Sequence, residues 1–119
     1  MTINLTAADF ETTITEHPIV LIDFWASWCG PCRAFAPVFE RSSQSHPDVV
    51  HAKVDTEAEQ QLAAALQIQA IPTIMAFRDG ILVYRQPGAM PAAALEDLIT
   101  RIKALDMTDV HAKIAASTS

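Results

Sequence analysis

Cysteine, glycine and aromatic residues are all scarce in this chain. Of its 119 residues only two are cysteines and three are glycines, and 7% are aromatic. These counts exclude a disulfide-rich scaffold and a glycine-rich fibrous protein. A domain of this length buries about two-thirds of the surface that its unfolded chain exposes, so a hydrophobic core alone can hold it together. We therefore expect one globular domain in which the cysteines are free for chemistry.

Positive charge is also scarce, and long hydrophobic runs are lacking. Eight basic residues stand against 14 acidic ones, for a net charge of -6, and such a surface repels phosphate backbones and anionic lipid heads. The most apolar run, residues 19–26, contains Asp23 and is far shorter than the roughly 20 residues of a membrane span. Residues 1–18 lack the positive start of a signal peptide. We expect a cytoplasmic protein with no nucleic-acid or membrane partner.

Hydrophobic periodicity predicts an alternating order of helices and strands. The first strand is apolar on both faces, as in a central strand covered by helices on each side. Arg78-Asp79-Gly80 is a hairpin signal, so the last strand is antiparallel to the one before it. The predicted fold class is α/β, with a central mixed sheet of four or five strands flanked by helices on both faces. Strands are expected at residues 19–26, 49–55, 71–77 and 81–85, and helices at residues 6–16, 29–43, 56–66 and 91–105.

Cys29 and Cys32 are separated by two residues at the junction of a predicted strand and a predicted helix. Side chains at positions i and i+3 of a first helical turn lie about 5–6 Å apart at Cβ, close enough for a disulfide after modest adjustment. So short a loop stabilises a fold by only about 2 kcal/mol in the chain-entropy description. A disulfide between these cysteines would therefore stabilise the fold only weakly, and we expect the pair to undergo reversible oxidation and reduction instead.

The start of that helix also predicts which cysteine reacts first. Unpaired backbone N–H groups and the partial positive charge of a helix N-terminus favour a thiolate at Cys29. At an unperturbed pKa near 8.5 only about 3% of a thiol is ionised at pH 7, and lowering the pKa by about 1.5 units raises this to roughly half. We therefore expect Cys29 to attack a disulfide and Cys32, one turn deeper, to resolve the mixed disulfide.

Asp23 interrupts an otherwise apolar strand. A carboxylate is costly to bury unless it is paired or protonated, so we expect a raised pKa for Asp23. Lys53, in the neighbouring predicted strand, is its expected partner. An acid beneath the dithiol could accept the Cys32 proton during the second step. The alternative is a structural Asp23–Lys53 pair that takes no part in the chemistry.

Several separated motifs in this chain resemble those of bacterial thioredoxins. They are the sequence FWASWCGPC at residues 24–32, Asp23, Lys53, Ile71-Pro72-Thr73 and Gly88, and the resemblance runs in order and spacing from about residue 3 to residue 104. It implies a thioredoxin fold for residues 1–105, with residues 106–119 as a C-terminal extension that is partly helical or disordered. It assigns Cys29 as attacking thiol, Cys32 as resolving thiol and Asp23 as buried acid. It also implies a cis peptide bond between Ile71 and Pro72.

The resemblance further implies a protein-disulfide reductase that works by dithiol–disulfide exchange. It implies no bound cofactor and no metal; the redox group is the Cys29–Cys32 disulfide, which receives electrons from NADPH through a thioredoxin reductase. That reductase and disulfide-containing client proteins are the expected partners of a monomer. Clients bind as extended segments on an apolar rim, and the alternative for Trp28 is a place in the core. The expected rim residues are Trp28, Gly30, Pro31, Ile71, Pro72 and Gly88.

Two other interpretations stay open on the sequence. Cys29, Cys32, His46 and His51 formally match a two-cysteine, two-histidine zinc pattern. In zinc fingers both histidines share one helical face, whereas here His46 precedes Pro47 and His51 lies in a predicted strand. The other interpretation is a binding scaffold that uses the apolar rim without redox turnover.

Overall fold

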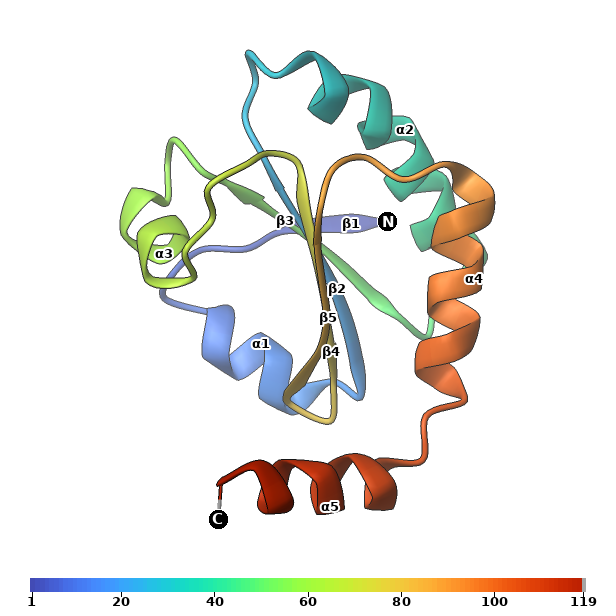
Figure 1. The fold of residues 1–119 in the computed structure, drawn as a ribbon. Helices are drawn as coiled ribbons and strands as arrows, with labels where there is room; N and C mark the ends of the chain where they lie inside the picture. Colours follow the sequence, from blue (N-terminus) through green and yellow to red (C-terminus); the bar gives the residue numbers. More distant parts are fainter. Residues whose placement is uncertain (119) are drawn as a thin grey trace.

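The computed structural model describes residues 1–118 as a five-stranded sheet with helices on both faces (Figure 1). The predicted α/β class and mixed sheet are confirmed. The strands lie side by side in the order β1-β3-β2-β4-β5. In chain order the elements are β1 (Thr2–Asn4), α1 (Phe10–Glu16), β2 (Ile19–Trp25), α2 (Gly30–Ser45), β3 (Val50–Asp55), α3 (Gln60–Ala65), β4 (Thr73–Arg78), β5 (Ile81–Pro87), α4 (Ala92–Lys103) and α5 (Met107–Thr118).

Parallel and antiparallel pairing meet at β2, the central strand. β2 runs parallel to β3 and antiparallel to β4, and the outer strands β1 and β5 pair with β3 and β4 respectively. Asp79 and Gly80 form the predicted hairpin turn with φ angles of 53° and 79°, the left-handed conformation that suits a two-residue turn between twisted strands. Sequence analysis missed β1, because three residues carry too little periodicity and their extended form depends on pairing with β3.

The side chains of β2 alternate between two hydrophobic clusters. Val20, Ile22 and Phe24 point towards α1 and α3, whereas Ile19 and Leu21 point towards α2 and α4. All five are buried, because helices cover both faces of the strand. Alternation along the strand places Asp23 on the same face as Ile19 and Leu21, the face that α2 covers.

Both α1 and α3 begin several residues later than the sequence predicts. The Asp9 carboxylate accepts hydrogen bonds from the backbone N–H and the hydroxyl of Thr6, which holds the residues before α1 in a turn. Asp55 Oδ1 accepts hydrogen bonds from the N–H groups of Glu57 and Ala58, which delays α3 in the same way. In both places an aspartate side chain competes with the helix for backbone donors.

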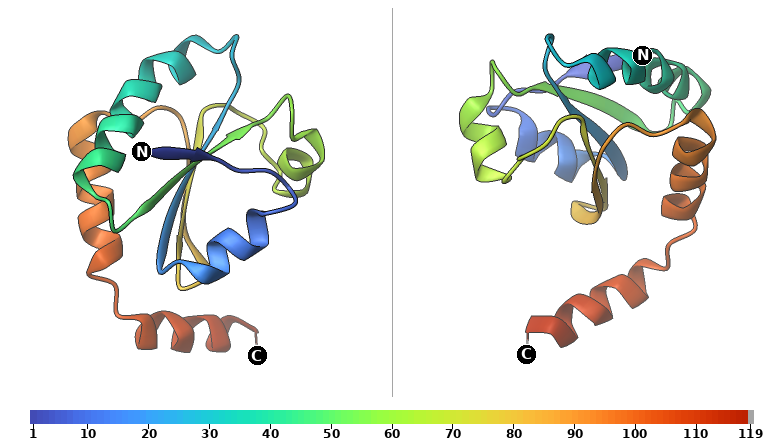
Figure 2. Two further views of the ribbon diagram at one scale, coloured as in Figure 1. Left: turned by 180° about the vertical axis from the view of Figure 1, so that it is seen from behind. Right: turned by 45° about the horizontal axis from the view of Figure 1, so that its top comes forward.

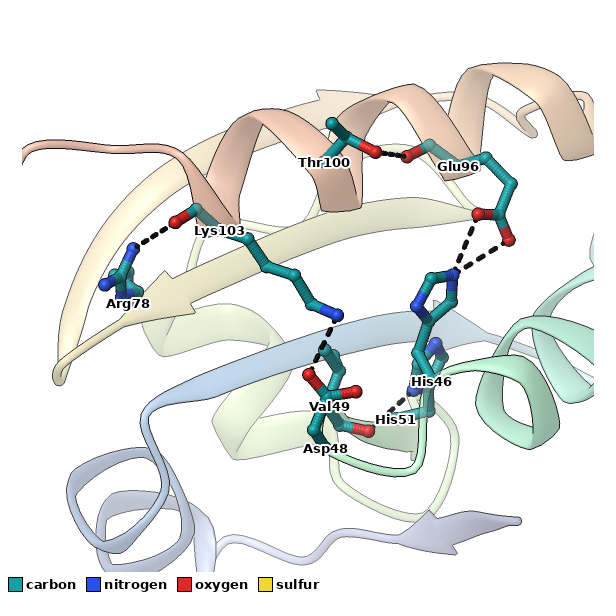
Figure 3. A network of polar contacts seen from close by, with 8 residues as sticks. All are labelled: His46, Asp48, Val49, His51, Arg78, Glu96, Thr100 and Lys103. Atoms are coloured by element: carbon teal, nitrogen blue, oxygen red, sulfur yellow. Dashed lines mark hydrogen bonds and ion pairs between the residues drawn. The ribbon is translucent and has the colours of Figure 1, made fainter.

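Polar contacts fasten the C-terminal end of α2 to α4 (Figure 3). His46 Nε2 lies 2.8 Å and 3.0 Å from the two carboxylate oxygens of Glu96. Lys103 Nζ lies 2.8 Å from Asp48 Oδ2 in the loop that follows α2. These contacts fix α2, the helix that begins beside the cysteines, at the end farthest from them.

α5 follows α4 after a connection of residues 104–106 and lies apart from the sheet (Figure 2). Asp106 Oδ1 accepts hydrogen bonds from the N–H groups of Thr108 and Asp109, so the aspartate caps the start of α5. Among residues 1–118, every helix is too short or too polar to cross a membrane.

Candidate active site

Cys29 is the N-cap of α2, in the loop that leaves the central strand. Its φ and ψ angles of -84° and 114° are extended, and its Sγ accepts a hydrogen bond of 3.2 Å from the backbone N–H of Cys32. The two cysteines form a disulfide, and their Cα atoms are 5.2 Å apart. Pro31 lies in the first turn of α2, where its missing N–H costs no helical hydrogen bond. The sequence prediction of a closable pair at a helix start is confirmed.

The surroundings of Cys29 favour a negative charge on its sulfur. The N-terminus of a helix carries a partial positive charge, and α2 has no acidic residue in its first turn to oppose it. Both cysteines are buried, at 4% exposure for Cys29 and 2% for Cys32. The Arg33 guanidinium donates a hydrogen bond of 2.8 Å to the Ser27 carbonyl and so braces the loop before Cys29. Sequence analysis did not single out Arg33, since an arginine one residue after the motif carries no signal of its own.

The Ile71–Pro72 segment lies directly against the disulfide. The peptide bond between these two residues is cis, as the resemblance implied. The Ile71 carbonyl oxygen lies 3.7 Å from Cys29 Sγ, within reach of the thiol of the reduced form. The Ile71 side chain packs on the cluster formed by Cys29, Cys32 and Ala26.

Gly88 is hydrogen-bonded to the Ile71–Pro72 segment. Its N–H donates a hydrogen bond of 2.7 Å to the Pro72 carbonyl, which joins the start of β4 to the end of β5. Gly88 has a φ angle of 103°, a conformation that a residue with a side chain rarely adopts. At Gly30 the space where a Cβ would stand is open. The structure therefore places Ile71 beside the disulfide with Pro72 and Gly88 joined next to it, and Gly30 and Pro31 in the first turn of α2 between the two cysteines.

Trp28 is 67% exposed, although it is one of the largest apolar residues in the chain. Its alternative placement in the core is therefore wrong. An indole left in solvent immediately before a redox-active cysteine adds apolar area to the surface that surrounds the disulfide.

Asp23 is fully buried, and neither of its carboxylate oxygens has a hydrogen-bond partner within residues 1–118. Burial raises the pKa of Asp23 from 3.8 to about 7, and the nearby charge of Lys53 opposes this rise. The predicted direction of the pKa shift is confirmed. At a pKa of about 7 the carboxyl group is poised to gain or lose a proton near neutral pH.

Lys53 is the neighbour of Asp23 in the sheet and does not bond to it. The two residues are register partners across β2 and β3, yet the Lys53 ammonium lies 4.9 Å from the centre of the Trp25 ring. Lys53 is thus the charged neighbour of Asp23 that the sequence predicts, but it forms no hydrogen bond with the carboxylate, because its ammonium group lies at the face of an indole ring. Lys53 acts on Asp23 only through its electrostatic field.

The zinc pattern is not assembled. The two cysteines are bonded to each other, His46 contacts Glu96, and the ring of His51 is hydrogen-bonded to Ser42. Within residues 1–118 no group of three histidine, cysteine, aspartate or glutamate side chains could hold a metal ion.

A disulfide that spans the first turn of a helix, beside an exposed indole and after a strand that buries a carboxyl group of raised pKa, is the arrangement of a dithiol–disulfide oxidoreductase. The comparisons agree. The family model named Thioredoxin matches residues 1–101, and the chain belongs to the thioredoxin family. The members of this family are protein-disulfide reductases that reduce target disulfides by dithiol–disulfide exchange, and the Cys29–Cys32 pair gives this chain the same activity.

Individual relatives support the assignment. The chain is 49% identical over 114 residues to "Putative thioredoxin 2" of Streptomyces coelicolor, a match that covers 96% of this chain and 85% of that protein. It is 42% identical over 96 residues to a Mycobacterium bovis thioredoxin, with 79% and 83% covered. Among solved structures, the X-ray structure of Fasciola hepatica thioredoxin superposes with a TM-score of 0.77 at 40% identity, covering 85% of this chain and 98% of that one.

Proposed function

We propose that Cys29 is the attacking thiol and Cys32 the resolving thiol of this reductase. The observation that carries the assignment is the position of Cys29 Sγ at the N-terminus of α2, where it accepts the Cys32 N–H. That hydrogen bond and the helix dipole stabilise a thiolate on Cys29. Cys32 lies within the first turn of α2 with its sulfur against Cys29 Sγ, so it is placed to attack a mixed disulfide formed on Cys29.

The exchange runs in two steps. The Cys29 thiolate attacks one sulfur of the client disulfide, so that a Cys29–client bond forms, the client S–S bond breaks and the other client sulfur leaves as a thiolate. Asp23 in its carboxylate form takes the proton of the Cys32 thiol, and the Cys32 thiolate attacks Cys29 Sγ. The second client sulfur then leaves. The client disulfide is reduced to a dithiol, and the Cys29–Cys32 dithiol is oxidised to the disulfide.

The client segment is expected to lie on the rim formed by Trp28, Gly30, Pro31, Ile71, Pro72 and Gly88. Exposure of the Trp28 ring and the open space at Gly30 support this surface. An extended client chain could pair with the backbone beside Pro72, in the manner of strand addition. The Ile71 side chain then packs against the client residue that precedes or follows the attacked cysteine.

The cycle is completed when the disulfide is reduced again. We propose that a thioredoxin reductase supplies these electrons from NADPH, and that the protein works in the cytoplasm, because only a reducing compartment keeps the pair in its active dithiol form. We assign this function to residues 1–105, an extent supported by the family match over residues 1–101.

Substitution of each cysteine by serine tests the assignment. With NADPH and a bacterial thioredoxin reductase, Cys29→Ser should abolish insulin-disulfide reduction. Cys32→Ser should instead trap clients as mixed disulfides visible on a non-reducing gel, since nothing resolves them. Ser27→Ala serves as the control, because only the backbone carbonyl of Ser27 contacts the active-site loop through Arg33. Turnover by Cys29→Ser, or release of free product by Cys32→Ser, would contradict the assigned roles.

A further inference from the structure

A small polar pocket of about 190 Å³ lies next to the Ile71–Pro72 segment. Figure 1 shows the chain crossing there from α3 to the start of β4, at the end of the sheet where β5 finishes. Ala70 directly precedes Ile71, and Pro87 directly precedes Gly88, so the pocket is continuous with the rim on which clients are expected to lie. The residues that line it are Gln67, Gln69, Ala70, Thr73, Arg85 and Pro87.

Arg85 is the one charged residue among those that line this pocket. Its guanidinium group donates hydrogen bonds of 2.6 Å to the carbonyl oxygens of Leu66 and Gln67, where the chain leaves α3. Gln67 has a φ angle of 56°, the left-handed conformation that often ends a helix. Two of the five guanidinium N–H groups are used in this way, and within residues 1–118 no further hydrogen bond occupies the others. The backbone thus fixes a planar cation that keeps donors for a ligand.

The positive charge of Arg85 is not neutralised by an acidic side chain. Arg101, Lys103 and Lys113 each form an ion pair with an aspartate, whereas within residues 1–118 no carboxylate pairs with Arg85. The carbonyl groups that hold Arg85 carry only partial charges. On a chain with a net charge of -6, which repels acidic clients as a whole, this cation attracts negative charge locally.

We propose that the pocket is a subsite for a client carboxylate, and that Arg85 binds an aspartate or glutamate one or two residues away from the attacked client cysteine. The inference rests on the proposed function, because a client reaches the pocket only if it lies extended beside Ile71 and Pro72. Side chains of an extended chain point alternately to its two faces. The subsite therefore recognises an acidic residue at particular positions, and it favours clients that carry one there.

Reaction rates of model peptides test the position dependence. Each peptide has one cysteine in a mixed disulfide with thionitrobenzoate, and attack of Cys29 on the peptide sulfur releases the coloured aryl thiolate. The reference peptide has glutamine at the two positions on each side of the cysteine, and each of the others has glutamate at one of these positions. Stopped-flow absorbance should show a rate about three- to fivefold higher for glutamate at one position, or at two positions that share a face. Equal rates for all peptides, or the same gain at every position, would overturn the proposal.

Substitutions of Arg85 separate its charge from its hydrogen bonds. Arg85→Met removes the charge and both carbonyl bonds, and it should bring the ratio of glutamate to glutamine rates to about one. Arg85→Lys keeps the charge without the planar fork, and it should retain most of the ratio. Arg41→Met is the matched control, because it removes an exposed charge of α2 that pairs with no acid within residues 1–118, and it should leave the ratio unchanged. The same ratio in both Arg85 variants, or an equal loss in Arg41→Met, would overturn the proposal.

The reference peptide and insulin distinguish this inference from the proposed function. If the protein reacts with the glutamine peptide and reduces insulin, but glutamate adds nothing to the rate, the reductase stands and the subsite is wrong. If Cys29→Ser releases the aryl thiolate as fast as the unsubstituted protein, the attacking role of Cys29 is wrong and the subsite falls with it.

Discussion

Two buried polar residues, Asp23 and His51, occupy neighbouring strands on the same face of the sheet. Asp23 in β2 pairs in register with Lys53, and His51 in β3 pairs with Leu21, so both side chains point towards α2. Their exposed fractions are 0% and 1%. They differ in their hydrogen bonds: neither oxygen of Asp23 has a partner within residues 1–118, whereas both ring nitrogens of His51 are bonded.

The bonds of His51 define its protonation. The Val49 carbonyl accepts a hydrogen bond of 3.0 Å from Nδ1, so Nδ1 carries the proton, and Nε2 accepts the hydroxyl of Ser42 at 2.9 Å (Figure 3 shows the Val49 bond). The ring also packs against Phe39, with 5.0 Å between ring centres. Burial lowers the pKa of His51 and keeps it neutral. A buried polar group whose hydrogen bonds are all made in this way stabilises the fold.

Asp23, in contrast to His51, is buried without hydrogen bonds from any of residues 1–118. A buried carboxyl group without hydrogen bonds costs stability in its charged form, and its pKa rises to about 7 as a result. That cost falls in the strand that leads to the disulfide, and the role proposed for Asp23, acceptor of the Cys32 proton, requires a group that exchanges a proton near neutral pH. Burial shifts the pKa of both groups, and it places only that of Asp23 near neutral pH; the two groups differ further in that hydrogen bonds satisfy His51 and not Asp23.

The largest expected effect is on the pH dependence of stability at Asp23. The folded protein holds a proton on Asp23 between its unfolded pKa of 3.8 and its folded pKa of about 7, so the unfolding free energy falls as the pH rises through this range, by about 4 kcal/mol. Asp23→Asn has no such titration and should lack this decline. Urea unfolding of the oxidised proteins at about pH 5 and about pH 8 measures the upper part of this decline, about 2.7 kcal/mol, because two pH units separate pH 5 from the folded pKa. Parallel pH curves for the two proteins would contradict the raised pKa.

The next effect concerns His51, whose titration lowers the unfolding free energy as the pH falls, whereas that of Asp23 lowers it as the pH rises. His51→Ala should lower the unfolding free energy by about 2–4 kcal/mol, because it removes a buried ring and leaves Ser42 without its acceptor. In the unsubstituted protein, His51 gains a proton below about pH 6.5 when the chain is unfolded, but it stays neutral to lower pH when the chain is folded. The unfolding free energy therefore falls as the pH falls. The variant should lose this acid-side decline while still reducing insulin where it is folded. Loss of activity in the folded variant would make His51 part of the chemistry.

A smaller effect is expected at Ser42, which satisfies His51. Ser42→Ala leaves Nε2 of the buried ring without a donor and should cost about 1–3 kcal/mol of unfolding free energy. The adjacent Ser43 is a matched control: it is also buried, but its hydroxyl bonds only to the Glu40 carbonyl of its own helix at 2.6 Å. Ser43→Ala should cost clearly less than Ser42→Ala in the same urea titration. Equal losses would mean that the Ser42–His51 bond adds nothing specific.

Local patterns and long-range pairing differ in how well the sequence predicts them. The buried β2, the Cys29–Cys32 pair and the hairpin at Asp79 depend on neighbours within a few residues, and the sequence predicts all three. The partner of His51, the edge strand β1 and the placement of the Lys53 charge over Trp25 depend on the register between segments far apart in the chain. Nothing in the pattern around His51 indicates that a serine on α2 will reach its ring, which is why the zinc alternative stayed open.

The smallest effect tests whether Lys53 acts on Asp23 through space alone. Lys53→Met keeps an apolar stem beside Trp25 and removes the charge that lowers the pKa of Asp23, so this pKa should rise further and the stability change should be about 1 kcal/mol or less. With the Asp23 carboxylate as the proposed acceptor of the Cys32 proton, Cys32 should resolve a mixed disulfide preformed on Cys29 at half of the maximal rate at a higher pH in the variant. Stopped-flow measurement across pH records this shift, and Lys103→Met, whose charge pairs with Asp48 far from the cysteines, should leave the profile unchanged. A shift of the half-maximal rate to lower pH would mean that Lys53 influences Asp23 by something other than its positive charge.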